Sequence, residues 1–374
     1  MNESLRALFP ITKNYVYLNH AAVSAPPAPT LQAINNQIND VVQHGSLHFR
    51  SWVATKERSR KMIANIMNAR PRQIAFMRNT SDAISTIANG FKWQAGENIV
   101  TYEHEFPSNI YPWLRIRDAY SVEVRMCEER DGRVDVDQLI DLIDENTRVV
   151  AISHVQYASG YRVDLERLGQ AARKVGALLI VDVMQSLGVL PVDVDSQLID
   201  AAACACHKWL LTPEGIGILY LSERARERVG PTLVGWISVP NPEDYYNFEQ
   251  GWREGALTWE TGTGPAALFY GLEASLNLLM EIGVERIASY LEELTDYLCE
   301  RLKGSDYEVV SSRDKGEKSQ IVCIRHKGAL TPNEIYQHLK ERKIIVAPRN
   351  DLLRIAPHIY NNEEDIDALV AALP

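Results

Sequence analysis

Two ionisable residues, Asp182 and Lys208, carry the clearest chemical signal in this sequence. Asp182 closes the apolar run Ala-Leu-Leu-Ile-Val at residues 177–181, and Lys208 lies in Cys-His-Lys-Trp-Leu-Leu at residues 206–211. A carboxylate or an ammonium group is costly to bury alone, so each of them needs a partner. A pyridoxal phosphate (PLP) ring offers both partners. Its aldehyde can form a Schiff base with the lysine, and its ring nitrogen can stay protonated beside the aspartate.

The residues around this pair form two separated motifs. Gln185 follows Asp182 by three positions, and Lys208 is followed by Thr-Pro-Glu-Gly-Ile-Gly at residues 212–217. Here the chain resembles the class V aminotransferase family, whose members share a D-x-x-Q element and a later H-K-W-L-x-x-P-x-G-x-G element. The resemblance covers residues 17 to about 361. It implies a PLP-dependent enzyme of fold-type I with Lys208 as the catalytic residue.

Composition indicates an ordinary globular protein with two domains. The chain has 374 residues, of which 46% are hydrophobic and 24% charged, and this length exceeds that of a single simple core. The 39 basic and 49 acidic residues give a net charge of −10, which argues against a nucleic-acid or membrane partner. The first ten residues do not resemble a signal peptide, and no apolar run approaches the ~18 residues that span a bilayer. We therefore expect a cytoplasmic enzyme.

Cysteine usage does not predict a disulfide framework or a metal site. The five cysteines are few and scattered, unlike those of small disulfide-rich domains. Cys204 and Cys206 precede His207 and could suggest a metal site. In an extended strand the two cysteines share one face and His207 points to the other. No second ligand pair occurs elsewhere, so we expect no metal.

The order of apolar segments predicts an α/β fold. Expected strands cover residues 98–102, 122–126, 147–154, 177–181, 199–205 and 216–221, and expected helices cover residues 80–91, 109–120, 136–143 and 165–174. Strands that are apolar on both faces belong to a mainly parallel sheet between helices. The resemblance implies the seven-stranded type of sheet found in PLP fold-type I.

After residue 262 the pattern changes and predicts a smaller α+β domain. Two long helices at residues 266–282 and 287–302 precede strands and helices at residues 307–311, 320–325, 332–342, 344–347 and 353–355, and a last helix begins at residue 363. We expect a large PLP-binding domain over residues 15–262 and a small domain over residues 263–374. The segment 1–14 is expected to pack nearby.

The resemblance assigns the cofactor phosphate to a helix N-terminus. Thr80 and Ser81 open an expected helix, where hydroxyls and free N–H groups form an anion site. Without the resemblance the same residues could be a simple helix cap. His207 matches the family histidine before the lysine that also reaches the phosphate. Many relatives have a serine where this chain has Ala205, so one phosphate contact must come from elsewhere.

The resemblance also implies residues around the ring and the substrate. Phe106 matches the position of a flat ring that stacks on the pyridine, where cysteine desulfurases carry a histidine. Gln185 is expected to donate a hydrogen bond to the phenolic oxygen of PLP. Arg354 matches the arginine that grips the substrate carboxylate with a two-pronged contact. Asn19 matches a segment at the substrate entrance, and Tyr157 either replaces a family asparagine or packs.

One further assignment reaches across a subunit interface. The segment Glu-Thr-Gly-Thr-Gly at residues 260–264 resembles a family loop that contacts the neighbour's phosphate. Thr263 is therefore expected to bind the cofactor of the opposite chain in a homodimer. A glycine-rich hinge between the domains is the alternative, and the two interpretations are compatible.

The motifs leave several reactions open for an amino-acid substrate. We expect an aminotransferase first, with a PLP-dependent β-lyase (cysteine lyase or kynureninase-like) or an amino-acid epimerase as alternatives. A cysteine desulfurase of the persulfide-forming kind is disfavoured, because it needs a loop cysteine before Arg354 and residues 344–353 contain none. A non-catalytic PLP-fold binding module is the alternative from another class, and the presence of Lys208 argues against it.

Overall fold

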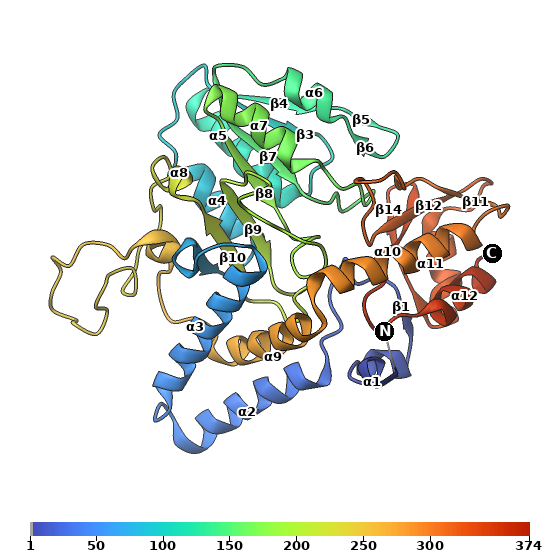
Figure 1. The fold of residues 1–374 in the computed structure, drawn as a ribbon, viewed down its shortest axis with the longest axis horizontal. Helices are drawn as coiled ribbons and strands as arrows, with labels where there is room; N and C mark the ends of the chain where they lie inside the picture. Colours follow the sequence, from blue (N-terminus) through green and yellow to red (C-terminus); the bar gives the residue numbers. More distant parts are fainter. Residues whose placement is uncertain (1–2) are drawn as a thin grey trace.

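A seven-stranded sheet forms the centre of the larger part of the molecule (Figure 1). The computed structural model describes residues 3–374. In spatial order the strands are β2 (Ile74–Met77), β10 (Gly217–Leu221), β9 (Ala201–Ala205), β8 (Leu178–Asp182), β7 (Thr147–Ser153), β3 (Asn98–Tyr102) and β4 (Glu123–Cys127). β10 runs opposite to the other six strands of this sheet, which are parallel to one another. The predicted mainly parallel sheet is therefore present.

Helices cover both faces of this sheet, which explains why its central strands are apolar throughout. They are α4 (Thr80–Gly90), α5 (Tyr111–Tyr120), α6 (Val136–Asp141), α7 (Leu165–Val175) and α8 (Glu223–Arg226). In β7, Val149 packs with the α4 and α5 side chains, whereas Val150 packs on the opposite face with Leu139 of α6 and Leu168 of α7. Alternate residues of one strand thus fill two separate cores.

A four-stranded antiparallel sheet organises the C-terminal part. Its order is β11 (Tyr307–Val309), β12 (Val322–His326), β15 (Leu352–Ile355) and β14 (Ala347–Arg349), with helices α10 (Val284–Arg301), α11 (Pro332–Glu341) and α12 (Glu363–Ala372). The single strand predicted at residues 344–347 is instead two. β13 (Ile344–Ile345) pairs with β1 (Val16–Tyr17), and the chain then crosses to β14 in the other sheet. We keep a domain division at about residue 262 as a proposal.

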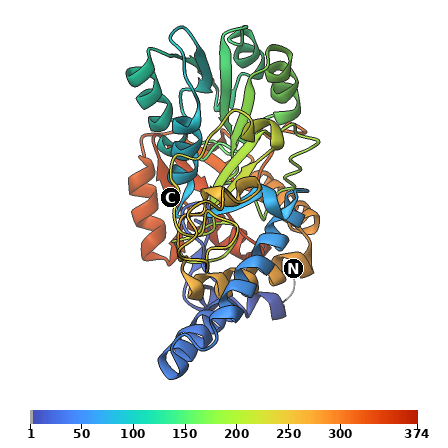
Figure 2. The same cartoon turned by 90° about the vertical axis from the view of Figure 1, so that its left-hand side faces the viewer.

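The N-terminal segment contacts both parts of the molecule. α1 (Glu3–Arg6) and β1 lie beside the small domain, and Arg6 forms an ion pair with Asp365 of α12 at 2.6 Å (Figure 1). α2 (Ala28–His44) and α3 (Phe49–Ile66) form a hairpin that packs on α9 (Ala266–Ile282), as both views show (Figure 2). The short elements η1 (Pro10–Lys13), η2 (Pro71–Gln73), β5 (Glu129–Arg130), β6 (Arg133–Val134), η3 (Pro107–Asn109) and η4 (Gly255–Trp259) complete the fold.

A long irregular segment, residues 230–254, extends away from the sheet on the far side from the small domain (Figure 1). Within residues 3–374, no single helix combines the length and apolar character of a membrane span. α9 and α10 have the required length and apolar character only when they are taken together, and the two helices are bent by 73° at their junction.

Candidate active site

The predicted site residues gather around one cavity, which is lined by both the large sheet and the small domain. The cavity has a volume of about 400 Å³, within the range of sites for a cofactor and a small substrate. Its walls include Thr80, Ser81, Phe106, Tyr157, Asp182, Gln185, His207, Lys208 and Arg354. We call it the Lys208 cavity. A larger polar groove of about 1500 Å³ lies elsewhere, and none of these residues lines it.

Lys208 follows β9 and is fixed from behind by a buried aromatic cluster. His20 Nε2 lies 3.0 Å from the Lys208 carbonyl oxygen, and the His20 ring packs against Trp209 and His358. The Lys208 Nζ lies 5.6 Å from the centroid of the Phe106 ring. Burial lowers the pKa of the Lys208 ammonium below its usual range, which increases the fraction of free amine near neutral pH.

Asp182 ends β8 as a buried carboxylate with few partners. Its side chain is 4% exposed, and Oδ1 accepts a hydrogen bond from the N–H of Met184 at 2.7 Å. No lysine or arginine of residues 3–374 forms an ion pair with it. Burial raises the pKa of Asp182, and the nearby Glu105 carboxyl raises it further. A cation placed beside Asp182 would remove this cost.

The N-terminus of α4 presents donors to the same cavity. Asn79 is the N-cap, and its side chain accepts from the N–H of Asp82 at 2.9 Å. Ser81 Oγ contacts Ser108 Oγ at 2.7 Å. A Cβ on Gly217 would meet the Asn79 nitrogen at 2.7 Å, so only glycine lets β10 pass beneath this loop. The resulting cradle of N–H groups suits a phosphate.

Arg354 reaches the cavity from β15 and is held by its neighbours. The side chain is 1% exposed, and it donates to the Tyr157 carbonyl at 3.0 Å and to Asn19 Oδ1 at 3.3 Å. Its buried Nε has no hydrogen-bond partner. Burial, together with the charge of Arg349, lowers the pKa of Arg354 to about 10. An incoming carboxylate would satisfy both the free donor and the uncompensated charge.

Two further predicted residues shape the cavity wall. Phe106 and Tyr157 pack edge to face, with ring centroids 5.2 Å apart. The side-chain carbonyl of Gln185 accepts from Trp209 Nε1 at 2.8 Å, and its amide donates to the Ala21 carbonyl at 3.1 Å. Because a side-chain amide has two N–H bonds, Gln185 keeps one donor for a ligand.

Two predicted site residues lie outside the cavity lining. Asn19 accepts the hydrogen bond from Arg354 described above, so its contribution to the site is to position Arg354. Thr263 lines a separate pocket with Lys56 and Glu260, and its expected contact with a partner's cofactor stays a prediction. Ala205 lines the cavity beside His207 and offers no hydroxyl, as its sequence indicated.

Sequence reasoning missed several residues of the site. Arg349 lines the cavity, and its position five residues before Arg354 was the available signal. Glu105 is buried and accepts hydrogen bonds from the Ser153 N–H at 2.6 Å and from Gln156 Nε2 at 2.7 Å. Nothing in the local pattern distinguished Glu105 from a surface glutamate, because two of its partners, Ser153 and Gln156, come from the end of β7 and the loop after it.

Comparisons with known proteins agree on one family. The chain matches the aminotransferase class V family over residues 16–369. A probable cysteine desulfurase of Methanothermobacter thermautotrophicus is 33% identical over 79% of this chain and 74% of its own length. An uncharacterized aminotransferase of Bacillus subtilis is 26% identical over 97% of this chain and 95% of its own length. The apo structure of a cysteine desulfurase from Thermococcus onnurineus superposes with a TM-score of 0.89 at 25% identity, over 99% of this chain and 97% of that one.

Proposed function

We propose, from the premise that the chain belongs to the class V aminotransferase family, that it cleaves a carbon–sulfur bond at the β-carbon of an amino acid. The family and the fold-type I architecture expected from the sequence are confirmed. The chain is a PLP-dependent enzyme, and its substrate and reaction are the parts that we propose.

The residues of the Lys208 cavity fit the cofactor. An unpaired buried carboxylate at Asp182 suits a cationic ring nitrogen, and the N–H groups at Thr80 and Ser81 suit a phosphate. Lys208 would hold the aldehyde, and the free donor of Gln185 would meet the phenolic oxygen. When bound, PLP withdraws electrons from the substrate's α-carbon.

The chain's own side chains would then orient the substrate and move one proton. The Arg354 fork binds the α-carboxylate and fixes how the α-carbon faces the ring. The Lys208 Nζ, released as a free amine, accepts the proton from the α-carbon. Phe106 covers the cavity near Nζ and limits the access of water. These roles serve elimination, transamination and epimerisation equally.

The absence of a thiol in the cavity lining distinguishes elimination from the persulfide-forming reaction of a desulfurase. None of the five cysteines lines the Lys208 cavity, and four of them are buried, with Cys299 half-buried. The segment before Arg354, where a desulfurase would need its cysteine, instead supplies Arg349. Relatives named cysteine desulfurase support chemistry at a β-sulfur. Together these features favour release of the sulfur fragment to solution without a protein-bound persulfide.

The balanced reaction is a β-elimination followed by hydrolysis. The cysteine S-conjugate loses its α-proton and its thiolate, the thiolate takes up a proton, and water converts the remaining enamine to pyruvate and ammonium. No oxidant or reductant is required. Lys208 supplies the base, and the leaving thiolate needs no acceptor group on the protein.

Transamination is the second candidate, and it was our first expectation from the sequence. The Bacillus subtilis relative named as an aminotransferase matches 97% of this chain. In that reaction Lys208 would again move the α-proton, and the substrate would keep its β-substituent. Epimerisation would return the proton to the opposite face of the α-carbon, which requires a second base on that face.

A product assay separates these reactions. The holoenzyme is mixed with L-cysteine, L-cystine, S-substituted cysteines and ordinary amino acids, with and without a keto acid. We expect pyruvate, ammonium and the released sulfur fragment in equal amounts, also after Cys299→Ser. The fragment is sulfide from L-cysteine, a persulfide from L-cystine and a thiol from S-substituted cysteines. Keto-acid-dependent amino transfer without thiol release would establish transamination instead. Loss of activity in Cys299→Ser would point to a protein thiol and contradict the proposal.

The enzyme is proposed to act as a homodimer. The segment 230–254 exposes a cluster of large apolar side chains, namely Leu233, Val234, Trp236, Tyr245, Tyr246, Phe248 and Trp252. A single chain leaves these rings in water, which marks an interaction surface. Thr263 lines a pocket with Leu233 and Val234 of this segment and does not line the Lys208 cavity of its own chain. Mixing Lys208→Ala chains with Thr263-disrupted chains tests the shared site, because one hybrid cavity regains both groups.

A further inference from the structure

Two arginines of the small domain face the Lys208 cavity together. The register of β14 and β15 places Ala347 opposite Arg354 and Arg349 opposite Leu352. Paired residues share a side of the sheet, and alternate residues along a strand point to the same side. Arg349 and Arg354 therefore project from the same face, and both line the cavity.

Neither guanidinium has a carboxylate partner among residues 3–374. Arg349 is half-buried, and its Nη1 donates only to the carbonyl of Pro348 at 2.7 Å. Its charge adds to burial in lowering the pKa of Arg354 and of Lys208. Three neighbouring cations repel one another unless ligands neutralise them. One substrate α-carboxylate neutralises Arg354 and leaves Arg349 without a counter-charge.

We propose that Arg349 binds a second anionic group, carried at the side-chain end of the substrate. The substrate class is then an amino acid whose β-sulfur bears a carboxylate or a sulfonate. The presence of a β-sulfur in the substrate rests on the proposed function. The recognition of two anions rests on the geometry of Arg349 and Arg354 alone.

A binding experiment tests the two-anion site without turnover. The holoenzyme is titrated calorimetrically with succinate, which has two carboxylates, and with butyrate, which has the same number of carbons and one. Because a hydrogen bond to a charged group contributes about 1.5–3 kcal/mol, we expect succinate to bind about ten- to a hundredfold more tightly. Arg349→Gln should bring the ratio near one. Arg325→Gln, on the same sheet but paired with Asp351, should keep it.

Two outcomes would overturn the proposal. One is equal affinity for succinate and butyrate in the wild-type protein. The other is an unchanged ratio in Arg349→Gln together with weaker cofactor binding, which would assign Arg349 to the cofactor phosphate. Neither result depends on which reaction the enzyme catalyses, so the failure of this inference is distinct from the failure of the proposed lyase.

Turnover offers a second, matched comparison. S-carboxymethylcysteine ends in a carboxylate, and S-carbamoylmethylcysteine ends in a neutral amide of the same shape. We expect kcat/KM to favour the carboxymethyl compound by about tenfold or more in the wild type, mainly through KM, and Arg349→Gln to remove that preference. A preference that persists in Arg349→Gln would contradict the role of this arginine.

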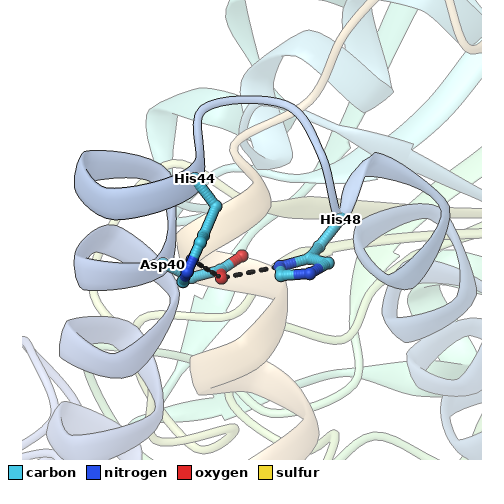
Figure 3. Close-up of side chains that lie close together, drawn as sticks. All are labelled: Asp40, His44 and His48. Atoms are coloured by element: carbon cyan, nitrogen blue, oxygen red, sulfur yellow. Dashed lines mark hydrogen bonds and ion pairs between the residues drawn. The ribbon is translucent and has the colours of Figure 1, made fainter.

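A second, independent feature lies far along the chain from these arginines, at the turn between α2 and α3. Asp40 and His44 lie one helical turn apart on α2, and His48 precedes α3 (Figure 3). The Nδ1 atoms of His44 and His48 lie 2.9 and 2.8 Å from the same oxygen, Asp40 Oδ1. We call these three residues the His–Asp cluster.

The geometry of the His–Asp cluster suits a divalent transition metal. One donor atom from each residue lies within 4.8 Å of the other two, and ligands about 2.0–2.2 Å from a zinc ion stand about 3 Å apart. Imidazole and carboxylate are preferred ligands of Zn²⁺, Ni²⁺ and Cu²⁺.

We infer that the His–Asp cluster binds one transition-metal ion, with water completing the coordination, and that the ion ties the end of α2 to the start of α3. The cluster lies on the hairpin of α2 and α3 and takes no part in the chemistry of the Lys208 cavity. Replacing the shared hydrogen bonds with metal–ligand bonds would remove two Nδ1 protons or shift them to Nε2.

Calorimetric titration of the holoenzyme with ZnCl₂ tests the site. We expect one zinc ion per chain in the wild type and in His104→Ala, a control whose exposed imidazole pairs with Glu129 alone at hydrogen-bond distance. His44→Ala should weaken binding about tenfold or more. Equal binding by wild type and His44→Ala, or an equal loss in His104→Ala, would refute the site.

Discussion

Two buried charge clusters in this molecule differ in how fully they are paired. Around Glu260, both carboxylate oxygens are occupied: Arg60 Nη1 and Lys56 Nζ each lie 2.6 Å away, and the Phe76 N–H donates at 2.8 Å. In the Lys208 cavity, Asp182 has one backbone donor and Arg354 keeps a free Nε. In the first cluster the buried carboxylate finds all its partners within the chain. In the second cluster the buried charged groups would gain their missing partners only from ligands.

This difference separates stability from function. A buried charge whose partners are all present contributes to a fixed structure, and removing one partner leaves an uncompensated charge. A buried charge without a partner costs stability in the empty protein, and that cost is recovered when a cofactor or substrate binds. We therefore expect substitutions at Glu260 to reduce stability first and substitutions in the Lys208 cavity to reduce turnover first.

The largest expected effect is that of Lys208→Ala on catalysis. Removing the amine that holds the cofactor and moves the proton should lower kcat by at least about 10⁴-fold, while the melting temperature stays close to that of wild type. Borohydride treatment followed by peptide mapping should find no covalent cofactor on the protein. A cofactor adduct at another lysine would contradict the assignment.

Asp182→Asn should have the next largest effect. The amide keeps the shape of the side chain but loses the charge that keeps the ring nitrogen protonated, so turnover should fall by roughly 10²–10⁴-fold while the cofactor still binds. In the cofactor-free protein the same change should not lower the melting temperature, because it removes an unpaired buried charge. A near-wild-type rate would mean that another group governs the ring.

Arg354→Gln should lower kcat/KM by about a hundredfold. The loss of a charged, two-pronged contact costs a few kcal/mol, and each 1.4 kcal/mol is a factor of ten. Steady-state kinetics with any amino acid that the enzyme accepts measures this fall in kcat/KM. The Asn19→Ala control removes only a supporting bond at 3.3 Å, so it should cost less than Arg354→Gln. The reverse order would show that Arg354 does not contact substrate.

Glu260→Gln should instead reduce stability. The change removes the carboxylate partner of Lys56 and one of the two carboxylate partners of the buried Arg60, which keeps its pair with Glu57. Losing this buried charge should cost about 3 kcal/mol of unfolding free energy. Denaturant unfolding of the cofactor-free protein measures this change. Arg72→Gln, at an exposed pair with Glu223, is the control and should cost at most about 1 kcal/mol. Similar losses in both variants would contradict the contrast between buried and exposed pairs.

The smallest effects appear in the pH dependence of stability, with opposite signs at the two clusters. Burial alone would raise the pKa of Glu260, but the charges of Arg60 and Lys56 lower it to about 2. Its contribution is therefore present above pH ~4.5 and lost as the pH falls toward 2. Burial raises the pKa of Asp182 to about 7, so the cofactor-free protein loses stability as the pH rises from about 4 to about 7.

Melting temperatures between about pH 3 and 8 test these signs in the cofactor-free protein. Relative to wild type, Glu260→Gln should flatten the loss of stability at acid pH, and Asp182→Asn should flatten the loss toward neutral pH. If both variants change the same side of the profile, the two clusters are not opposite in character.

The bounds of a helix or strand were predicted correctly where residues such as proline and glycine mark its ends in the sequence. The expected helix at residues 266–282 coincides with α9, which begins after Pro265 and ends at Gly283 with a φ of 88°. The expected strand at residues 98–102 coincides with β3. At residues 344–347 the same reasoning was wrong, because the chain changes from one sheet to another there. Such a change depends on partners that are distant in sequence.

The candidate site divides along similar lines. Motif residues such as Lys208 and Asp182 lie together in one cavity, because motifs record chemistry as well as local structure. Arg349 and Glu105 were missed, since their importance comes from strand register and from partners on other elements. The proposed contribution of Thr263 would depend on a second chain, which no pattern within one chain can position.

The pairing of β1 with β13 also determines the order in which the enzyme can be completed during synthesis. Val16 and Tyr17 emerge from the ribosome early, but their partners Ile344 and Ile345 are made near the end. Asn19 must likewise wait for Arg354, the residue that it orients. Contacts between such distant positions close slowly, because a long loop must be ordered first. A nascent or truncated chain that ends before residue 344 therefore carries Lys208 and a large sheet but lacks the arginine side of its cavity.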